Sequence, residues 1–192
     1  MNVKEKAKIY STDYYKSLNK LLKENVKGNK IFIMGTHADN DVKQFLDKDV
    51  LIIDPFNSFF KEYKEEFEKF KNIKIKKMLW EDINVNKIFD CVICCDCIEH
   101  SKKPYKILNK ITKLSNRIIL SCPNGFWWFR DAHRYEDHGH GAHISHFTIG
   151  ELKKFFKQRG YKVEIRGLLH YPWLRGIFSL GIFLKAVKNE KT

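Results

Sequence analysis

Proline and glycine are scarce in this sequence, and long apolar runs are missing. Its 192 residues include only 4 prolines and 10 glycines, which excludes collagen-like chains and Pro/Gly-rich disordered chains. No apolar run reaches the roughly 18–20 residues that are needed to cross a bilayer. The N-terminal stretch lacks the apolar segment of a signal peptide, since it reads MNVKEKAKIYSTDYYKSL. We therefore expect a protein of the cytoplasm.

Cysteine is present in an odd number and is unevenly placed. Four of the five cysteines crowd into Cys91–Cys97, and the fifth is Cys122. Such a set is a poor disulfide framework, so we expect reduced thiols. The spacing Cys-x-x-Cys occurs twice in the crowded stretch, but a zinc site would require a second pair elsewhere. A buried strand and its exit turn is the favoured context.

Positive charge is in excess, with 36 Lys and Arg against 23 Asp and Glu and a net charge of +13. Such an excess suits either an acidic partner or a lysine-rich surface that keeps the protein soluble. The lysines are spread along the chain, and neither an Arg-rich run nor a nucleic-acid-binding motif is recognisable. We therefore favour the solvated surface and expect no sequence-specific nucleic-acid partner.

Short apolar runs alternate with amphipathic segments along the chain. The length favours one domain over residues 1–192, with a helical N-terminal extension over residues 1–28. The predicted strands are Lys30–Met34, Val50–Ile53, Ile73–Lys77, Phe89–Cys94, Arg117–Ser121, Tyr161–Ile165 and Gly176–Val187. The predicted helices are Asp13–Lys27, Asp41–Leu46, Phe59–Phe70, Pro104–Leu114 and one from a capping box at Thr148–Glu151 to Arg159. This alternation predicts an α/β fold with a mostly parallel sheet between helices, and one of the last two strands antiparallel.

Polar and aromatic side chains follow two of the predicted strands, at the edge where such sheets bind ligands. Asp54 ends a buried strand, where its carboxylate can accept hydrogen bonds from both hydroxyls of a ribose; it can equally be a turn residue beside Pro55. Trp80–Asp82 follows the next strand. These residues can lie against an adenine ring and its amine, or the tryptophan can simply cover the sheet.

Acids and histidines mark two further segments. Asp96, Glu99 and His100 follow the strand Phe89–Cys94, where an acid and an imidazole can act in acid–base catalysis or form a surface turn with a helix-capping acid. The segment Asp131–His146 holds five of the eight histidines, namely His133, His138, His140, His143 and His146. This segment can be a divalent-metal site, a substrate-binding lid or a solvated loop, and the first two alternatives both remain open.

Several segments between Lys30 and Val187 together resemble the class I S-adenosylmethionine-dependent methyltransferases, and most of all their type 11 branch. The strongest is Phe89–His100, which reads FDCVICCDCIEH and is similar to that family's "FD-apolar … EH" segment. Ser121–Gly125 is similar to the Pro-Asn turn after the fifth strand. His143–Tyr161 resembles the stretch "H-x-x-x-[FW]-[ST] … EL … GY/F".

The first glycine-rich turn departs from this pattern, in which an acid precedes Gly-x-Gly-x-Gly. Gly35 matches the first glycine, whereas Ile33 occupies the place of the acid. His37 and Asp39 occupy the places of the later glycines, which let the backbone approach the methionine part of the cofactor.

The resemblance implies a Rossmann-like three-layer α/β/α sandwich that transfers a methyl group from S-adenosylmethionine to a small-molecule or glycan-like acceptor. The cofactor contacts that it implies are Gly35, Asp54, Trp80, Asp82 and Cys95. The candidates for acceptor binding or proton removal are His100, His138 and His140. No residue is assigned as a metal ligand. Two alternatives remain: an inactive binding or assembly protein, which the altered turn favours, and a metal-dependent enzyme that uses the His-rich segment.

Overall fold

The computed structural model describes residues 13–35, 42–55, 61, 64–84, 88–125, 143–170 and 179–188 of the chain. Its strands are β1 (Lys30–Met34), β2 (Asp49–Asp54), β3 (Ile73–Lys77), β4 (Cys91–Cys95), β5 (Arg117–Pro123), β6 (Tyr161–His170) and β7 (Ser179–Lys188). Its helices are α2 (Asp13–Asn25), α5 (Pro104–Leu114) and α7 (Ile149–Lys157), with short 3₁₀ turns η1 (Trp80–Asp82) and η2 (Ile98–His100).

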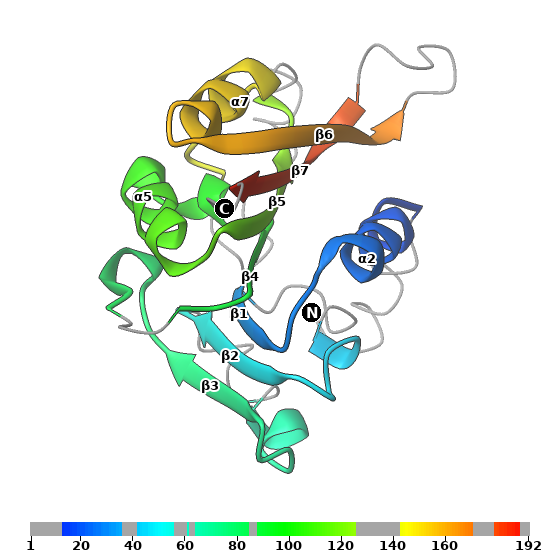
Figure 1. Ribbon diagram of the computed structural model, residues 1–192, viewed down its shortest axis with the longest axis vertical. Helices are drawn as coiled ribbons and strands as arrows, with labels where there is room; N and C mark the ends of the chain where they lie inside the picture. Colours follow the sequence, from blue (N-terminus) through cyan, green and yellow to red (C-terminus); the bar gives the residue numbers. More distant parts are fainter. Residues whose placement is uncertain are drawn as a thin grey trace.

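The described strands form one sheet in the order β3-β2-β1-β4-β5-β7-β6 (Figure 1). β1 is parallel to β2 and β4, and the outer pairs β2–β3 and β4–β5 are parallel as well. β7 runs antiparallel to both β5 and β6. The predicted sheet, mostly parallel with one antiparallel strand near the C-terminus, is therefore confirmed. β3 lies at the edge of the sheet, as its alternation of isoleucine and lysine suggests.

Helices cover both faces of the sheet, because alternate strand residues point to opposite sides. On one face, Phe32 and Met34 of β1 belong to an apolar cluster with buried residues of α5 and α7. On the other face, Ile31 and Ile33 belong to a second cluster with α2 and with Phe67. The predicted three-layer α/β/α sandwich is confirmed.

The start of α7 shows how local sequence sets an element boundary. The side chain of Thr148 accepts a hydrogen bond from Glu151 N (3.3 Å), and Glu151 Oε2 accepts one from Thr148 N (2.8 Å), which confirms the capping box. The helix ends at Lys157, two residues before the predicted end. Gly160 follows it with a φ of +80°, a conformation that favours glycine.

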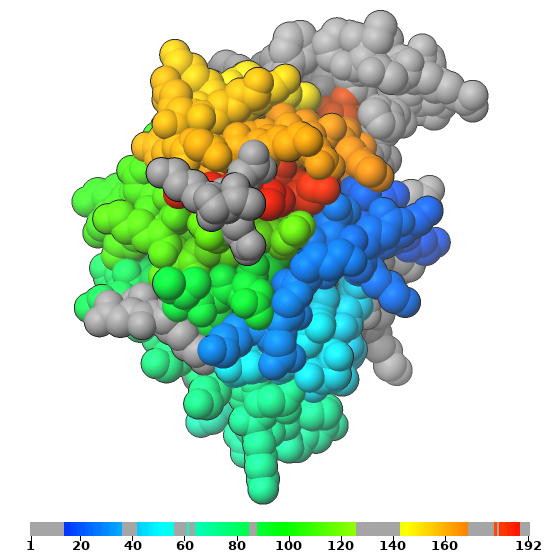
Figure 2. All heavy atoms as spheres, viewed as in Figure 1, coloured from blue at the N-terminus to red at the C-terminus, as the bar shows by residue number. Residues whose placement is uncertain are grey.

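The helix α2 packs beside the C-terminal strands, far from it in sequence. In Figure 2 its side chains (blue) meet those of β6 (orange) on the viewed face. A Cβ atom added to Gly181 in β7 would lie 2.6 Å from Cε2 of Tyr14. A glycine at this position therefore allows the helix to approach the sheet closely.

All five cysteines are buried and free of disulfide bonds. The helices in the described parts of the chain include none that is long and apolar enough to span a membrane.

Candidate functional site

The carboxyl ends of β1 and β2 and the turn after β4 meet at one edge of the sheet. Gly35 N donates a hydrogen bond to Ile53 O (2.9 Å), and Cys97 Sγ lies 2.8 Å from Met34 O. Gly35 has a φ of +75°, and an added Cβ there would lie 2.5 Å from Cys97 Sγ and 3.8 Å from Trp80 Cζ2. This position therefore requires a glycine, and it joins β1, η1 and the turn after β4.

The side chains predicted to contact the cofactor all lie at this edge but differ in exposure. Asp54, the last residue of β2, is 2% exposed, and its carbonyl accepts a hydrogen bond from Met78 N (3.2 Å) on the way to η1. Trp80 is 4% exposed. Cys95 ends β4 and is buried, whereas Asp82 is exposed at the end of η1. Gly35, Asp54 and Trp80 thus form a compact group, and Asp82 lies at its outer side.

The glycine-rich turn is described only at its first residue. His37 and Asp39 lie outside the described residues. Ile33, at the place where the family has an acid, is 2% exposed and packs in the apolar cluster that contains α2. The residue at that place is therefore part of the core.

Asp96 organises a polar group directly after β4. It has a φ of +47°, a conformation that Asp tolerates better than most residues. Its Oδ1 accepts hydrogen bonds from Tyr14 OH and Ser121 Oγ, each at 2.9 Å. Burial, together with the charge of Asp96, raises the pKa of Tyr14, so the phenol remains a donor. The sequence did not indicate Tyr14 and Ser121, because each also fits an ordinary position in its helix or strand.

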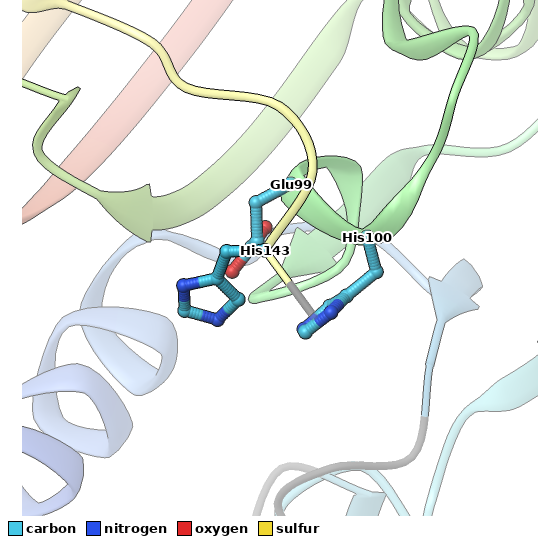
Figure 3. A group of neighbouring side chains, drawn as sticks. All are labelled: Glu99, His100 and His143. Carbon is cyan, nitrogen blue, oxygen red and sulfur yellow. The ribbon is translucent and has the colours of Figure 1, made fainter. Parts of the chain in front are cut away.

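Glu99, His100 and His143 converge from two separate segments (Figure 3). Their candidate ligand atoms all lie within 4.8 Å of one another, and the centroids of the two imidazole rings are 4.8 Å apart. Glu99 is 2% exposed, and the two histidines are half-buried. Burial raises the pKa of the Glu99 carboxyl well above its usual range, and the nearby charge of Asp96 raises it further.

Backbone hydrogen bonds hold the segment after His143 against η2. The amides of Ile144 and Ser145 both donate to the carbonyl of Glu99 at 2.9 Å. Ser145 Oγ donates to Ser101 O at 2.8 Å. The sequence indicated His100 and His143 in two separate motifs, and the tertiary structure brings these motifs together. The other predicted histidines, His138 and His140, lie outside the described residues.

Comparison with known proteins places this arrangement in a family. The family model described as "Methyltransferase domain" matches residues 8–164. Among curated proteins, none matches the sequence.

Solved structures of similar fold include three methyltransferases. An S-adenosylmethionine-dependent methyltransferase from Clostridium acetobutylicum has a TM-score of 0.70 at 13% identity, with 97% of this chain and 99% of that chain covered. Magnesium protoporphyrin IX methyltransferase from Synechocystis, with bound SAH, has a TM-score of 0.67 at 14% identity, with coverage of 95% and 92%. The methyltransferase domain of bacterial Hen1 has a TM-score of 0.66 at 16% identity, with coverage of 91% and 96%.

The family match covers most of the chain, and the strand order and antiparallel β7 agree with the fold of these structures. The chain therefore belongs to the methyltransferase-domain family, among the class I S-adenosylmethionine-dependent methyltransferases.

Proposed function

We propose that this protein transfers the methyl group of S-adenosylmethionine to a small-molecule or glycan-like acceptor. The observation that carries the proposal is the buried carboxylate of Asp54 at the carboxyl end of β2, beside Gly35, in a chain of this family. A carboxylate at that position can accept hydrogen bonds from the hydroxyls of a ribose. The cofactor, when bound, supplies an electrophilic methyl group on a sulfonium.

The residues at this edge suit the nucleoside part of the cofactor. Asp54 offers acceptors for the ribose, and Trp80 offers an aromatic surface close to Gly35. The exposed carboxylate of Asp82 suits the amine of adenine. Cys95 lies at the end of the neighbouring strand β4. At the methionine end, Ile33 provides no charge for the amino group.

The main task of such a protein is to hold an acceptor lone pair in line with the methyl carbon. Some acceptors must also lose a proton, and a half-buried imidazole can accept it. His100 is the described candidate for this role, because it follows β4 at the same edge of the sheet. His138 and His140 remain candidates for acceptor binding. The resemblance to the type 11 branch favours a small-molecule or glycan-like acceptor.

Calorimetric titration with S-adenosylhomocysteine tests the proposal. A hydrogen bond to a charged group is worth about 1.5–3 kcal/mol, so Asp54→Asn should weaken binding by roughly ten- to over a hundredfold. Asp49→Asn is the matched control, because Asp49 lies at the other end of the same strand and its loss should leave the affinity unchanged. Equal affinities of wild type and Asp54→Asn would remove Asp54 from the site.

One observation favours a second candidate function. Because Ile33 takes the place of the family's acid, the fold could serve as an inactive binding or assembly protein. If wild-type protein shows no binding of S-adenosylhomocysteine at millimolar concentration, this second function replaces the first.

A further inference from the structure

Three side chains that commonly bind metal ions meet at the carboxyl end of β4. Glu99 and His100 come from η2, and His143 comes from the segment before α7 (Figure 3). Their ligand atoms lie within 4.8 Å of one another. Among the described residues, these three side chains form the one group of His, Cys, Asp and Glu whose geometry suits a metal ion.

The Glu99 carboxyl gives an independent indication of a missing ligand. It is 2% exposed, and neither of its side-chain oxygens has a hydrogen-bond partner among the described residues. Buried polar side chains in native proteins almost always have such partners, because an unpaired polar group loses its hydration without compensation. Two unpaired oxygens beside two imidazoles are the donor set that a cation would complete.

We propose that Glu99, His100 and His143 bind a divalent transition-metal ion such as Zn²⁺. Two imidazoles and one carboxylate are a common ligand set for zinc with an open fourth position, whereas Mg²⁺ and Ca²⁺ prefer oxygen ligands. Ligand atoms on one tetrahedral zinc, bound at about 2.0–2.2 Å, lie about 3.4 Å apart. The widest separation in the group therefore has to close by about 1.4 Å. The half-buried imidazole rings leave room for that movement.

The backbone already holds the ligands in register. The carbonyl of Glu99 accepts hydrogen bonds from the amides of Ile144 and Ser145, both at 2.9 Å, so the residue after His143 is tied to a ligand residue. The segment that carries His143 is also held at Phe147, because Gly125 N donates a hydrogen bond to Phe147 O at 2.7 Å. Holding the ligands before the ion arrives lowers the entropy lost on binding.

The open fourth position of this site would take an oxygen ligand. If the protein transfers methyl groups, that ligand is an oxygen of the acceptor, whose pKa a bound cation lowers. With the cation bound, His100 is a ligand and does not accept the proton of the acceptor; the cation takes over the activation of the acceptor oxygen. This role rests on the proposed function; the cation site itself does not.

The test titrates the full-length protein with Zn²⁺ by calorimetry, after removal of metal with EDTA, and repeats the titration with Co²⁺ by visible absorption. Wild type should bind one ion at this site. Replacing a residue that merely hydrogen-bonds to a metal ligand lowers metal affinity by about 10–100-fold. Loss of a ligand itself, in His143→Ala or Glu99→Gln, should therefore weaken binding by at least about a hundredfold. His146→Ala is the matched control, because His146 is exposed, lies three residues from His143 and is outside the group. It should bind as wild type does.

Three results would overturn the proposal: no binding of either ion by wild type at millimolar concentration, binding unaffected by His143→Ala, or an equal loss in His146→Ala. Because Glu99 is buried and its substitution can disturb folding, the half-buried His143 provides the decisive variant. S-adenosylhomocysteine titrations of the same samples separate the two proposals. Zinc binding without cofactor binding refutes only the proposed function, and cofactor binding without zinc binding refutes only the cation site.

Discussion

Substitution of Gly125 by alanine should destabilise the protein through a clash of backbone atoms. Gly125 follows β5 and forms a close contact with the segment that carries His143. A Cβ atom at Gly125 would lie 2.8 Å from the carbonyl oxygen of Phe147, 2.9 Å from its nitrogen and 3.0 Å from its carbonyl carbon. All three are backbone atoms, so no side-chain rotation relieves the contact. Phe147 is itself 2% exposed and packs in the core.

The magnitude follows from two contributions. Extra volume in a well-packed region costs about 1–3 kcal/mol. The hydrogen bond from Gly125 N to Phe147 O, 2.7 Å long, is worth a further 0.5–1.5 kcal/mol on the usual net scale of about 1 kcal/mol per bond. If the two segments separate enough to break it, Gly125→Ala loses about 1.5–4.5 kcal/mol of unfolding free energy. For a chain of this size that corresponds to a fall in Tm of about 3–18 °C.

Urea unfolding followed by circular dichroism measures the effect, and a lower midpoint at an unchanged m-value is the sign of a lower free energy of unfolding. Gly150→Ala is the matched control. An added Cβ there has Thr148 Oγ1 as its nearest neighbour at 3.9 Å, and the residue lies in the first turn of α7. This control should be neutral or stabilising by up to about 0.5–1 kcal/mol. A Gly125→Ala protein within about 0.5 kcal/mol of wild type would refute the reasoning.

Two further stability predictions concern side chains that accept hydrogen bonds from backbone amides at the start of β1 and of α7. Asp90 Oδ2 accepts bonds from Lys30 N (2.8 Å) and Asn29 N (2.7 Å), which lower the pKa of its carboxyl below 3.8, its ordinary value. Because the pKa of Asp90 is lower in the folded than in the unfolded protein, its carboxylate stabilises the fold fully above the unfolded pKa of 3.8. That stabilisation is lost as the pH falls through the folded pKa. Asp90 is exposed, so Asp90→Ala should lower the free energy of unfolding by only about 1 kcal/mol at neutral pH. In urea titrations at falling pH, the difference in unfolding free energy between wild type and Asp90→Ala should shrink. A difference that stays constant with pH would contradict this account. Thr148→Ala removes the acceptor for Glu151 N, so it should lower the free energy of unfolding by about 0.5–2 kcal/mol, measured by thermal unfolding. A loss smaller than about 0.3 kcal/mol would show that the capping box does not stabilise the protein.

Periodicity and turn chemistry in the sequence were sufficient to predict most of the layered fold. The bounds predicted for Lys30–Met34, Ile73–Lys77 and Pro104–Leu114 agree with β1, β3 and α5. These elements depend on local patterns: an apolar run, an alternation of isoleucine and lysine, and a proline at the start of an amphipathic helix. Where such signals were weaker the bounds shifted, as for β6, which was predicted to end at Ile165 and runs on to His170. Its pairing with β7 extends it, and that pairing is a tertiary interaction.

The sequence also indicated which side chains lie at the carboxyl edge of the sheet, because each follows a predicted strand. Asp54, Trp80 and His100 could be selected in this way. Their neighbours could not. Tyr14 donates to Asp96, which lies 82 residues further along the chain, and His143 meets Glu99 only after the intervening α5 and β5 have been placed.

Local pattern fixes which face of an element is buried, but it carries no information about which distant segment packs there. That choice was made by the order β1-β4-β5 in the sheet, which sets the ends of these strands side by side. It was completed by backbone hydrogen bonds from Ile144 and Ser145 to Glu99, which hold a histidine from a later segment against η2. The sequence by itself therefore determined the fold class and the edge at which the site lies. Only the tertiary structure decided that a buried glutamate and two histidines share one position, since hydrogen bonds between distant segments leave no periodic trace in the chain.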